Sequence, residues 1–281
     1  MSRLIGPGRG NDFARYDSGT AFPPRPVDGD LFFRTDLDLL WVWRALYTEW
    51  RPITLDTAGR LLASIRPSSG AAMSALGTTV TLVGGSTPAQ GTATVWEATY
   101  RTRAATAASS SSSASIRTTQ FCVQGNTTSH SGYRCRFMFG LGSSLAGHRL
   151  FAGLVAQGTA IGNAEPDTIA SYVGVIGRTT DTNLQISSRR SGAATYADAG
   201  ASFPKTLVNV PLELWIAVAP NSGVYEVELR RLDTGATFQT DISSVESPGV
   251  NAFMAAHVWI NTSASSTAAN IELAAFDCYT Y

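Results

Sequence analysis

The chain has 281 residues, of which 44% are apolar and only 15% are charged, and its 21 basic side chains balance its 21 acidic ones. The apolar content excludes a broadly disordered protein, and the zero net charge argues against a nucleic-acid binder, which needs a basic surface to hold phosphates. No stretch approaches the roughly 20 apolar residues of a membrane helix, so we expect no membrane insertion.

The N-terminal part of the chain predicts an extended arm followed by a small hairpin. Residues 1–30 are rich in glycine, proline and arginine, and proline fixes φ and donates no backbone hydrogen bond. The aromatic runs within 31–44 then predict a β-hairpin. Three tryptophans within ten residues give this part more apolar surface than so small a unit can bury alone: Trp41, Trp43 and Trp50.

We therefore expect residues 1–55 to form an N-terminal unit that attaches the protein to a larger particle, because aromatic anchors dominate interface energies. The candidate attachment residues are Phe22, Pro23, Phe32, Trp41, Trp43 and Trp50.

Residues 56–103 predict a connecting β segment. From Thr78 onward apolar and polar residues alternate, which predicts one strand around Val80, and the aromatic run 95–100 predicts another. The tract 104–115 that follows is almost entirely alanine and serine. Because small side chains bury little apolar surface, this tract predicts an exposed loop.

From Ile116 to the end of the chain the alternation is sustained. Between 133 and 141, for example, alternate residues are apolar while Arg134 and Arg136 occupy the positions between them. Strands about ten residues apart with no helices between them predict an antiparallel β-sandwich. We therefore predict an all-β protein whose C-terminal domain, 104–281, is a jelly-roll-like β-sandwich.

The chain lacks the usual sequence marks of a catalytic or metal site. None of its three histidines has a second ligand at a metal-binding spacing, and neither a GxSxG elbow nor a phosphate-binding glycine loop is present. The cysteines are odd in number and irregularly spaced, which favours buried thiols over a disulfide framework or a zinc site. They are Cys122, Cys135 and Cys278.

Paired carboxylates are the remaining catalytic possibility, because glycan-cleaving enzymes use two of them a few ångström apart. The chain has three such pairs close in sequence: Asp28 and Asp30, Asp36 and Asp38, and Glu226 and Glu228. Turn formation explains the aspartates, and the two glutamates alternate with core residues as a solvated strand face. We therefore expect no enzymatic activity, no cofactor and no metal.

Two regions resemble structural proteins of tailed bacteriophages. The first is FPPRPVDGDLFFRTD at 22–36 with the tryptophans that follow it, and it is similar to a pattern found in phage fibre and structural proteins. The second resembles a C-terminal β-domain of phage tail and fibre proteins. It consists of RLFAGL at 149–154, GVIG at 174–177, DTNLQI at 181–186, ASFP at 201–204 and APN at 219–221.

The resemblance implies a virion structural protein, assembled in the host cytoplasm, and most simply a tail fibre or receptor-binding protein that attaches to the host surface without catalysis. It also implies a homotrimer whose N-terminal segment contacts other virion proteins. Two alternatives stay open. One is a head decoration, spike or adaptor protein of the virion, and the other is a glycan-binding or glycan-cleaving β-sandwich protein.

We expect the sandwich to recognise a host-surface glycan or protein through loops at one end, because loops on a rigid β scaffold can vary without disturbing the core. The candidate loops are the tract 104–115 and the turns around Asn126, Asn163 and Asn261.

Overall fold

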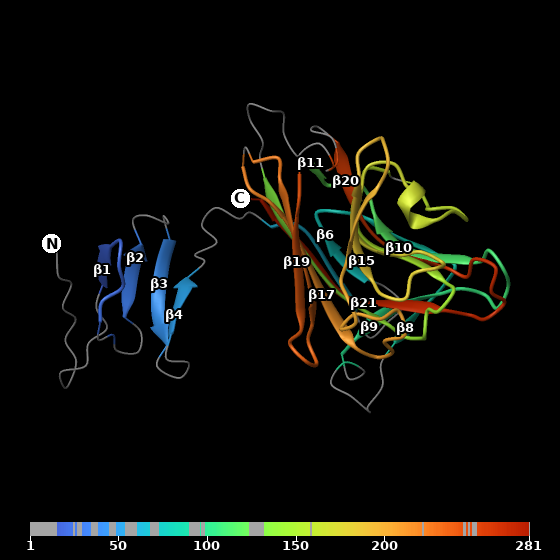
Figure 1. Ribbon diagram of the computed structural model, residues 1–281, viewed down its shortest axis with the longest axis horizontal. Coiled ribbons are helices and arrows are strands. Elements are labelled where there is room, and N and C mark those ends of the chain that lie inside the picture. The colour runs from blue at the N-terminus through green and yellow to red at the C-terminus, as the bar shows by residue number, and fades with distance from the viewer. Residues whose placement is uncertain are drawn as a thin grey trace. The chain divides into compact units, whose positions relative to one another are not determined.

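A computed structural model gives the structure of the protein, and it divides into two compact units, Met1–Ala58 and Gly59–Tyr281, which are described separately (Figure 1). The residues that the structure describes are 16–24, 26, 30–34, 39–44, 49–53, 61–67, 73–89, 96, 99–123, 132–157, 159–220, 222–243, 246, 248 and 252–280.

The first unit contains a four-stranded sheet in the order β1 (Tyr16–Gly19), β2 (Leu31–Arg34), β3 (Leu39–Arg44) and β4 (Glu49–Ile53). The expected hairpin is present as β2 and β3, which pair antiparallel. β4 extends it on one side, and β1 pairs with β2 in parallel on the other. The hairpin is therefore the centre of a wider sheet.

A nine-stranded antiparallel sheet forms one layer of the second unit. Its order is β19 (Thr237–Ile242), β18 (Tyr225–Arg231), β17 (Pro211–Val218), β12 (Tyr133–Leu141), β21 (Asn270–Thr280), β5 (Leu61–Pro67) and β6 (Met73–Leu76). β9 (Arg101–Ala105) also pairs with β21, and β8 (Gly85–Ala89) pairs with β9.

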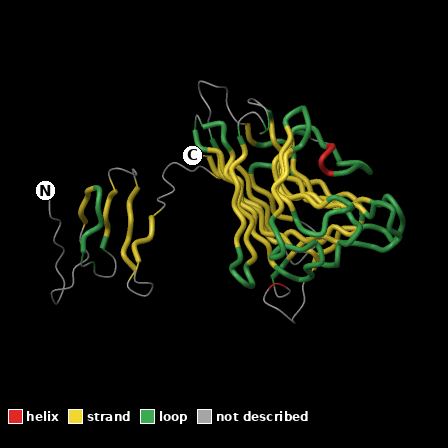
Figure 2. Tube along the Cα trace, in the orientation of Figure 1, coloured by secondary structure: helices red, strands yellow, loops and turns green. Residues whose placement is uncertain are grey.

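An eight-stranded antiparallel sheet forms the other layer. Its order is β16 (Thr195–Asp198), β15 (Gln185–Arg189), β14 (Tyr172–Gly177), β13 (Arg149–Val155), β20 (Phe253–Asn261), β10 (Ser113–Thr118) and β7 (Val80–Val83), with β11 (Cys122–Val123) beside β20. The short 3₁₀ helix η1 (Pro166–Thr168) lies in the loop that joins β13 to β14. Figure 2 shows the strands stacked in two layers.

The core lies between the two sheets, and the period-two pattern of each strand supplies it. On β12 the residues Tyr133, Cys135, Phe137 and Phe139 are fully buried, while the arginines between them are not. The facing strand β20 contributes Met254, Ala256, Val258 and Ile260 to the same core. The predicted all-β fold with an antiparallel sandwich is confirmed.

The segment 56–103 supplies β5 to β9, all of which pair within the two sheets of the second unit. Gly84 lets the chain pass from β7 in one sheet to β8 in the other: its φ is +80°, and a Cβ there would meet Ser113 O at 2.8 Å. The strand expected over 95–100 is not formed by its described residues. Trp96 instead packs against the nine-stranded sheet, where a Cβ on Gly140 would meet its ring at 2.7 Å.

The expected loop at 104–115 is shorter than its composition predicts. Ala104 belongs to β9 and Ala114 to β10, and both are fully buried. Their small side chains suit places where backbones approach closely, since Ala114 lies directly beside Gly84. Only the residues between the two strands, such as Ser110 and Ser111, are exposed.

A second, smaller core covers the outer face of the eight-stranded sheet. Phe151, Tyr172 and Trp259 are fully buried there beneath the loop that carries Ile161, and the Trp259 indole donates a hydrogen bond to the Ile161 carbonyl at 3.1 Å. His257 lies on this face next to Phe151, with their ring centres 6.4 Å apart. Among the described residues, no helix has the length and apolarity that a membrane span requires.

His257 is buried without a hydrogen-bond partner for either ring nitrogen among the described residues. Burial, assisted by the nearby Arg117 charge, lowers its pKa to about 3. Between the ordinary pKa of about 6.5 and this value, the unfolded chain binds a proton that the folded chain excludes. The contribution of neutral His257 to the free energy of unfolding is therefore fully present above pH 6.5, and it is lost progressively as the pH falls.

We predict that the free energy of unfolding decreases by about 1 kcal/mol for each pH unit between pH 6.5 and 5 because of His257. Substituting His257→Leu, which suits the apolar surroundings, should remove this part of the pH dependence. Urea unfolding of both proteins across this range measures it, and equal slopes for the two would contradict the assignment.

Candidate functional site

The candidate site lies on the face of the nine-stranded sheet that points away from the core, where polar side chains surround an aromatic ring. On β17, Leu214 and Ile216 enter the core, so Trp215 between them is directed to the opposite face, where it is only half-buried. A large aromatic ring at a polar-face position is unusual, because apolar side chains are normally placed inside.

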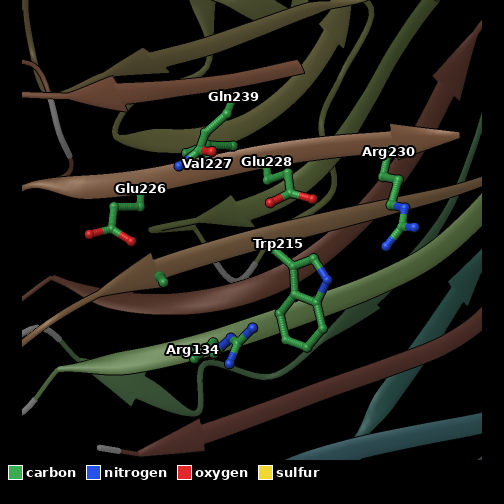
Figure 3. A pocket seen from close by; sticks show the side chains of 8 residues that line it. Arg134, Trp215, Glu226, Val227, Glu228, Arg230 and Gln239 are labelled. Carbon is green, nitrogen blue, oxygen red and sulfur yellow. The ribbon is translucent and has the colours of Figure 1, made fainter. Parts of the chain in front are cut away.

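Trp215 lines a shallow groove of about 450 Å³ formed by four neighbouring strands (Figure 3). The lining residues are Arg134 on β12, Trp215 and Ala217 on β17, Glu226, Val227, Glu228 and Arg230 on β18, and Gln239 on β19. The strand register places Glu228 directly opposite both Trp215 and Gln239. The groove thus has an aromatic floor with carboxylate, guanidinium and amide groups around it.

Two arginines of β12 hold the indole on one side. The guanidinium carbon of Arg134 lies 4.1 Å from the centre of the Trp215 ring, and that of Arg136 lies 5.7 Å away. Cation–π attraction of this kind favours a fixed ring position. Arg136 is fixed in turn by an ion pair with Glu213, at 2.6 Å between Nε and Oε1. The aromatic floor is therefore positioned before any ligand arrives.

The β18 and β19 side of the groove is different. Within the part of the chain that the structure describes, the side chains of Glu226, Glu228, Arg230 and Gln239 form no hydrogen bond or ion pair. Three of them are exposed and Glu228 is half-buried. Their donors and acceptors are therefore available to a ligand that displaces water.

The opposite half of the same sheet face is closed by ion pairs. Glu272, fully buried, accepts from Arg101 and from Arg103, each at 2.6 Å. Arg101 also donates to the Trp96 carbonyl and lies 5.0 Å from the centre of the Trp96 ring. A further pair joins Arg66 to Asp277 at 2.7 Å. These groups satisfy one another, which leaves the Trp215 groove as the open half.

The groove is suited to binding an uncharged or mixed polar molecule with one apolar side. The half-buried indole offers a flat apolar surface, and the surrounding side chains offer both donors and acceptors. Within the described residues there is no group of three or more His, Cys, Asp or Glu side chains that could hold a metal ion.

The structure places part of the predicted attachment cluster in the four-stranded sheet. The rings of Phe22 and Phe32 are in contact, with centroids 5.6 Å apart, and Phe32 is buried. Pro23, beside Phe22, is half-buried. The register pairs Phe32 with Trp41 and Trp43 with Trp50 across neighbouring strands. Their proposed role in attachment stays a prediction.

The loops predicted to bind ligand meet at one end of the sandwich, but their polar groups largely bond one another. Asn163 donates to Ser111 Oγ at 2.8 Å and accepts from Arg149 at 2.9 Å. Asn261 is fully buried and donates to Ser113 Oγ at 2.7 Å. Asn126 lies outside the described residues. These contacts serve mainly to hold the loops together.

The only lysine of the chain joins three segments at this same end. Lys205 is buried and donates to the carbonyl of His148 at 2.8 Å and to that of Arg178. Burial lowers its pKa to about 8, although the nearby Asp181 and Glu165 oppose that shift. The ammonium group thereby connects the segments that carry His148 and Arg178.

The sequence pattern predicts Glu226 and Glu228 to be a solvated strand face, and no motif points to Trp215. The signal for a site on this face was Trp215 itself. Leu212, Leu214 and Ile216 occupy alternate, core-facing positions of the strand, so Trp215 between them falls on the polar face. The grouping with Arg134 depends on the pairing of β12 with β17, which no local pattern reveals.

Comparisons with known proteins place the architecture, but not the family. No family model and no curated protein matches the chain. Among solved structures, it is similar to peanut lectin and to arcelin-5, a lectin-like defence protein from Phaseolus vulgaris. Each is 8% identical with a TM-score of 0.50, over 79% of this chain and 98% of the other. At this identity the likeness shows a shared fold alone.

A carbohydrate esterase from the Shiga toxin-encoding bacteriophage phi24B is also similar, at 14% identity and a TM-score of 0.46, over 79% of this chain and 99% of that one. It contradicts the prediction that the protein is not an enzyme, which rested on missing sequence motifs. That prediction is corrected: the absence of a known motif does not exclude catalysis, and this neighbour is named as a carbohydrate esterase.

We predict that two acid-to-amide substitutions on the same sheet face differ sharply in their effect on stability. Glu272→Gln should lower the free energy of unfolding by about 3–5 kcal/mol, because it leaves Arg101 buried without its counter-charge. Glu228→Gln should change it by less than about 0.5 kcal/mol, because Glu228 bonds no described side chain. Urea unfolding measures both, and similar losses would contradict the division into a closed and an open half.

Proposed function

We propose that the sandwich unit binds glycans through the Trp215 groove. The observation that carries this proposal is the half-buried indole, held by Arg134 on one side and bordered on the other by side chains that form no hydrogen bond or ion pair with any described residue. Glycan binding is one of the alternatives that the sequence leaves open, and the groove favours it over a purely structural role.

The chemistry of the groove matches that of a sugar. A pyranose ring has one face of C–H groups that can lie on an indole, and hydroxyls around its edge that both donate and accept hydrogen bonds. Glu228 and Gln239 supply acceptors, and Arg230 and Gln239 supply donors. The fold shared with peanut lectin is compatible with such binding, since that protein is named as a lectin.

A single shallow groove gives weak binding, with a Kd near the millimolar range, equivalent to about −4 kcal/mol. Several copies on one assembly would convert weak sites into firm attachment through effective concentration. The homotrimer implied by the phage resemblance would supply three grooves, and it stays a prediction.

We also propose that residues 1–58 attach the protein to a virion. The supporting observation is a separate small unit in which Phe22 contacts the buried Phe32 and aromatic positions pair across three strands. In this proposal the small sheet binds other virion proteins, and the sandwich presents the groove to the host surface. A tail fibre, a spike and a decoration protein would all use this arrangement.

We predict that Trp215→Ala lowers glycan affinity at least tenfold, because truncation of a central aromatic contact commonly costs about 1.4 kcal/mol of binding free energy. The full chain, displayed multivalently on beads, is first screened against an array of bacterial surface glycans. Each positive glycan is then titrated calorimetrically with the wild type and the variant.

Phe253→Ala is the matched control, because Phe253 is an exposed aromatic residue on the other sheet, with 59% of its surface accessible. It should leave affinity unchanged. Equal affinity for the wild type and Trp215→Ala, or binding lost equally in both variants, would contradict the proposed site. Release of acetate from bound glycans, measured in the same samples, reports any esterase activity.

We predict that deleting residues 1–58 leaves a folded sandwich that no longer enters virions, because the two units are compact separately. Circular dichroism and urea unfolding check the fold of the 59–281 fragment, and immunoblotting of purified particles checks incorporation. Incorporation at the wild-type level would show that the first unit is not the attachment site.

A further inference from the structure

We propose that Cys135 and Cys278 form a disulfide across the centre of the nine-stranded sheet when the protein meets an oxidising medium. The two residues are directly opposite each other on β12 and β21. Their Sγ atoms are 2.6 Å apart, and both residues are fully buried. The irregular spacing of the cysteines in the sequence conceals this pairing, because the two are 143 positions apart.

The backbone already has the geometry that such a bond needs. Directly opposite residues of antiparallel strands have Cα atoms about 4.5 or 5.5 Å apart, and both values fall in the range of about 4.4–6.8 Å found in disulfides. The register is continuous around the pair, from Tyr133 opposite Thr280 to Phe137 opposite Phe276. Bond formation therefore requires no shift of either strand.

The third cysteine is placed away from this pair. Cys122 belongs to β11, which pairs with Met254 and Phe253 of β20 in the other sheet. It therefore serves as an internal reference thiol, and the pairing of Cys135 with Cys278 is the one that the strand register favours.

The reaction with a small disulfide such as oxidised glutathione has two exchange steps. The Cys135 thiolate attacks one glutathione sulfur, which forms a mixed disulfide and releases one glutathione thiolate. The Cys278 thiolate then attacks the Cys135 sulfur, forms the protein disulfide and releases the second glutathione. Two protein thiols lose two protons and two electrons, and one oxidised glutathione becomes two reduced molecules.

Because both sulfurs are fully buried, the oxidant reaches them only when β21 opens or before the sheet closes. The bond is therefore expected to form during folding and slowly in the native protein. Once formed, it joins the last strand of the chain to β12 and closes a long loop, which restricts the unfolded chain.

The test uses the full chain, unfolded with reductant and refolded in either a glutathione redox buffer or reductant alone. Iodoacetamide in denaturant then marks every remaining thiol, including buried ones, and mass spectrometry of the digest locates them. In the redox buffer we expect alkylation at Cys122 only, together with a linked Cys135–Cys278 peptide pair two hydrogens lighter than the separate peptides. Alkylation of all three cysteines, or linkage to Cys122, would overturn the proposal.

A stability measurement provides the second readout. In a Cys122→Ser background, the oxidised protein should unfold at a temperature higher than the reduced protein by an amount on the order of 10 °C. Adding Cys278→Ala should abolish the difference between oxidised and reduced samples. A Cys122→Ser protein whose midpoint is the same in both states would also overturn the proposal.

Discussion

Each strand of the nine-stranded sheet gives one of its two faces to the core, and this constraint decides where the polar chemistry of the sandwich can lie. Because side chains alternate, the burial of Leu214 and Ile216 places Trp215 outside, and the burial of Cys135 does the same for Arg134 and Arg136. A shift of one residue in either strand would exchange the two sets. The hydrophobic layer therefore positions the groove as firmly as it holds the sheets together.

The charges on that outer face then fall into two arrangements with different consequences. Glu272 and Asp277 have arginine partners within ion-pair distance, so these groups stabilise the sheet and are closed to ligands. Glu226 and Glu228 have no such partner among the described residues and remain hydrated. Carboxylates on one continuous surface thus stabilise the sheet in one half of it and are available to bind a ligand in the other half.

The sequence predicts the class of fold well because period-two alternation is local information. The hairpin at 31–44 and the strands after residue 116 are recognisable from a few neighbouring residues. The groove is not, because Arg134 on β12 meets Trp215 only through the pairing of β12 with β17, which lies much later in the chain.

Composition misleads where packing overrides it. An alanine- and serine-rich tract predicts a loop, yet Ala104 and Ala114 fit strand positions that larger side chains could not occupy. The separation of Cys135 and Cys278 in the sequence matches no motif and does not predict their contact, because pairing across a sheet is independent of distance along the chain.

The position of β21 determines when in its synthesis the protein can fold. β21 follows all the other described strands in the sequence, yet it is central in its sheet, with β12 on one side and β5 and β9 on the other. Until β21 has been synthesised, the strands on either side have no partner at this position, and the growing chain exposes two unfilled sheet edges. A chain that stops before β21 would lack the middle of this sheet rather than its margin.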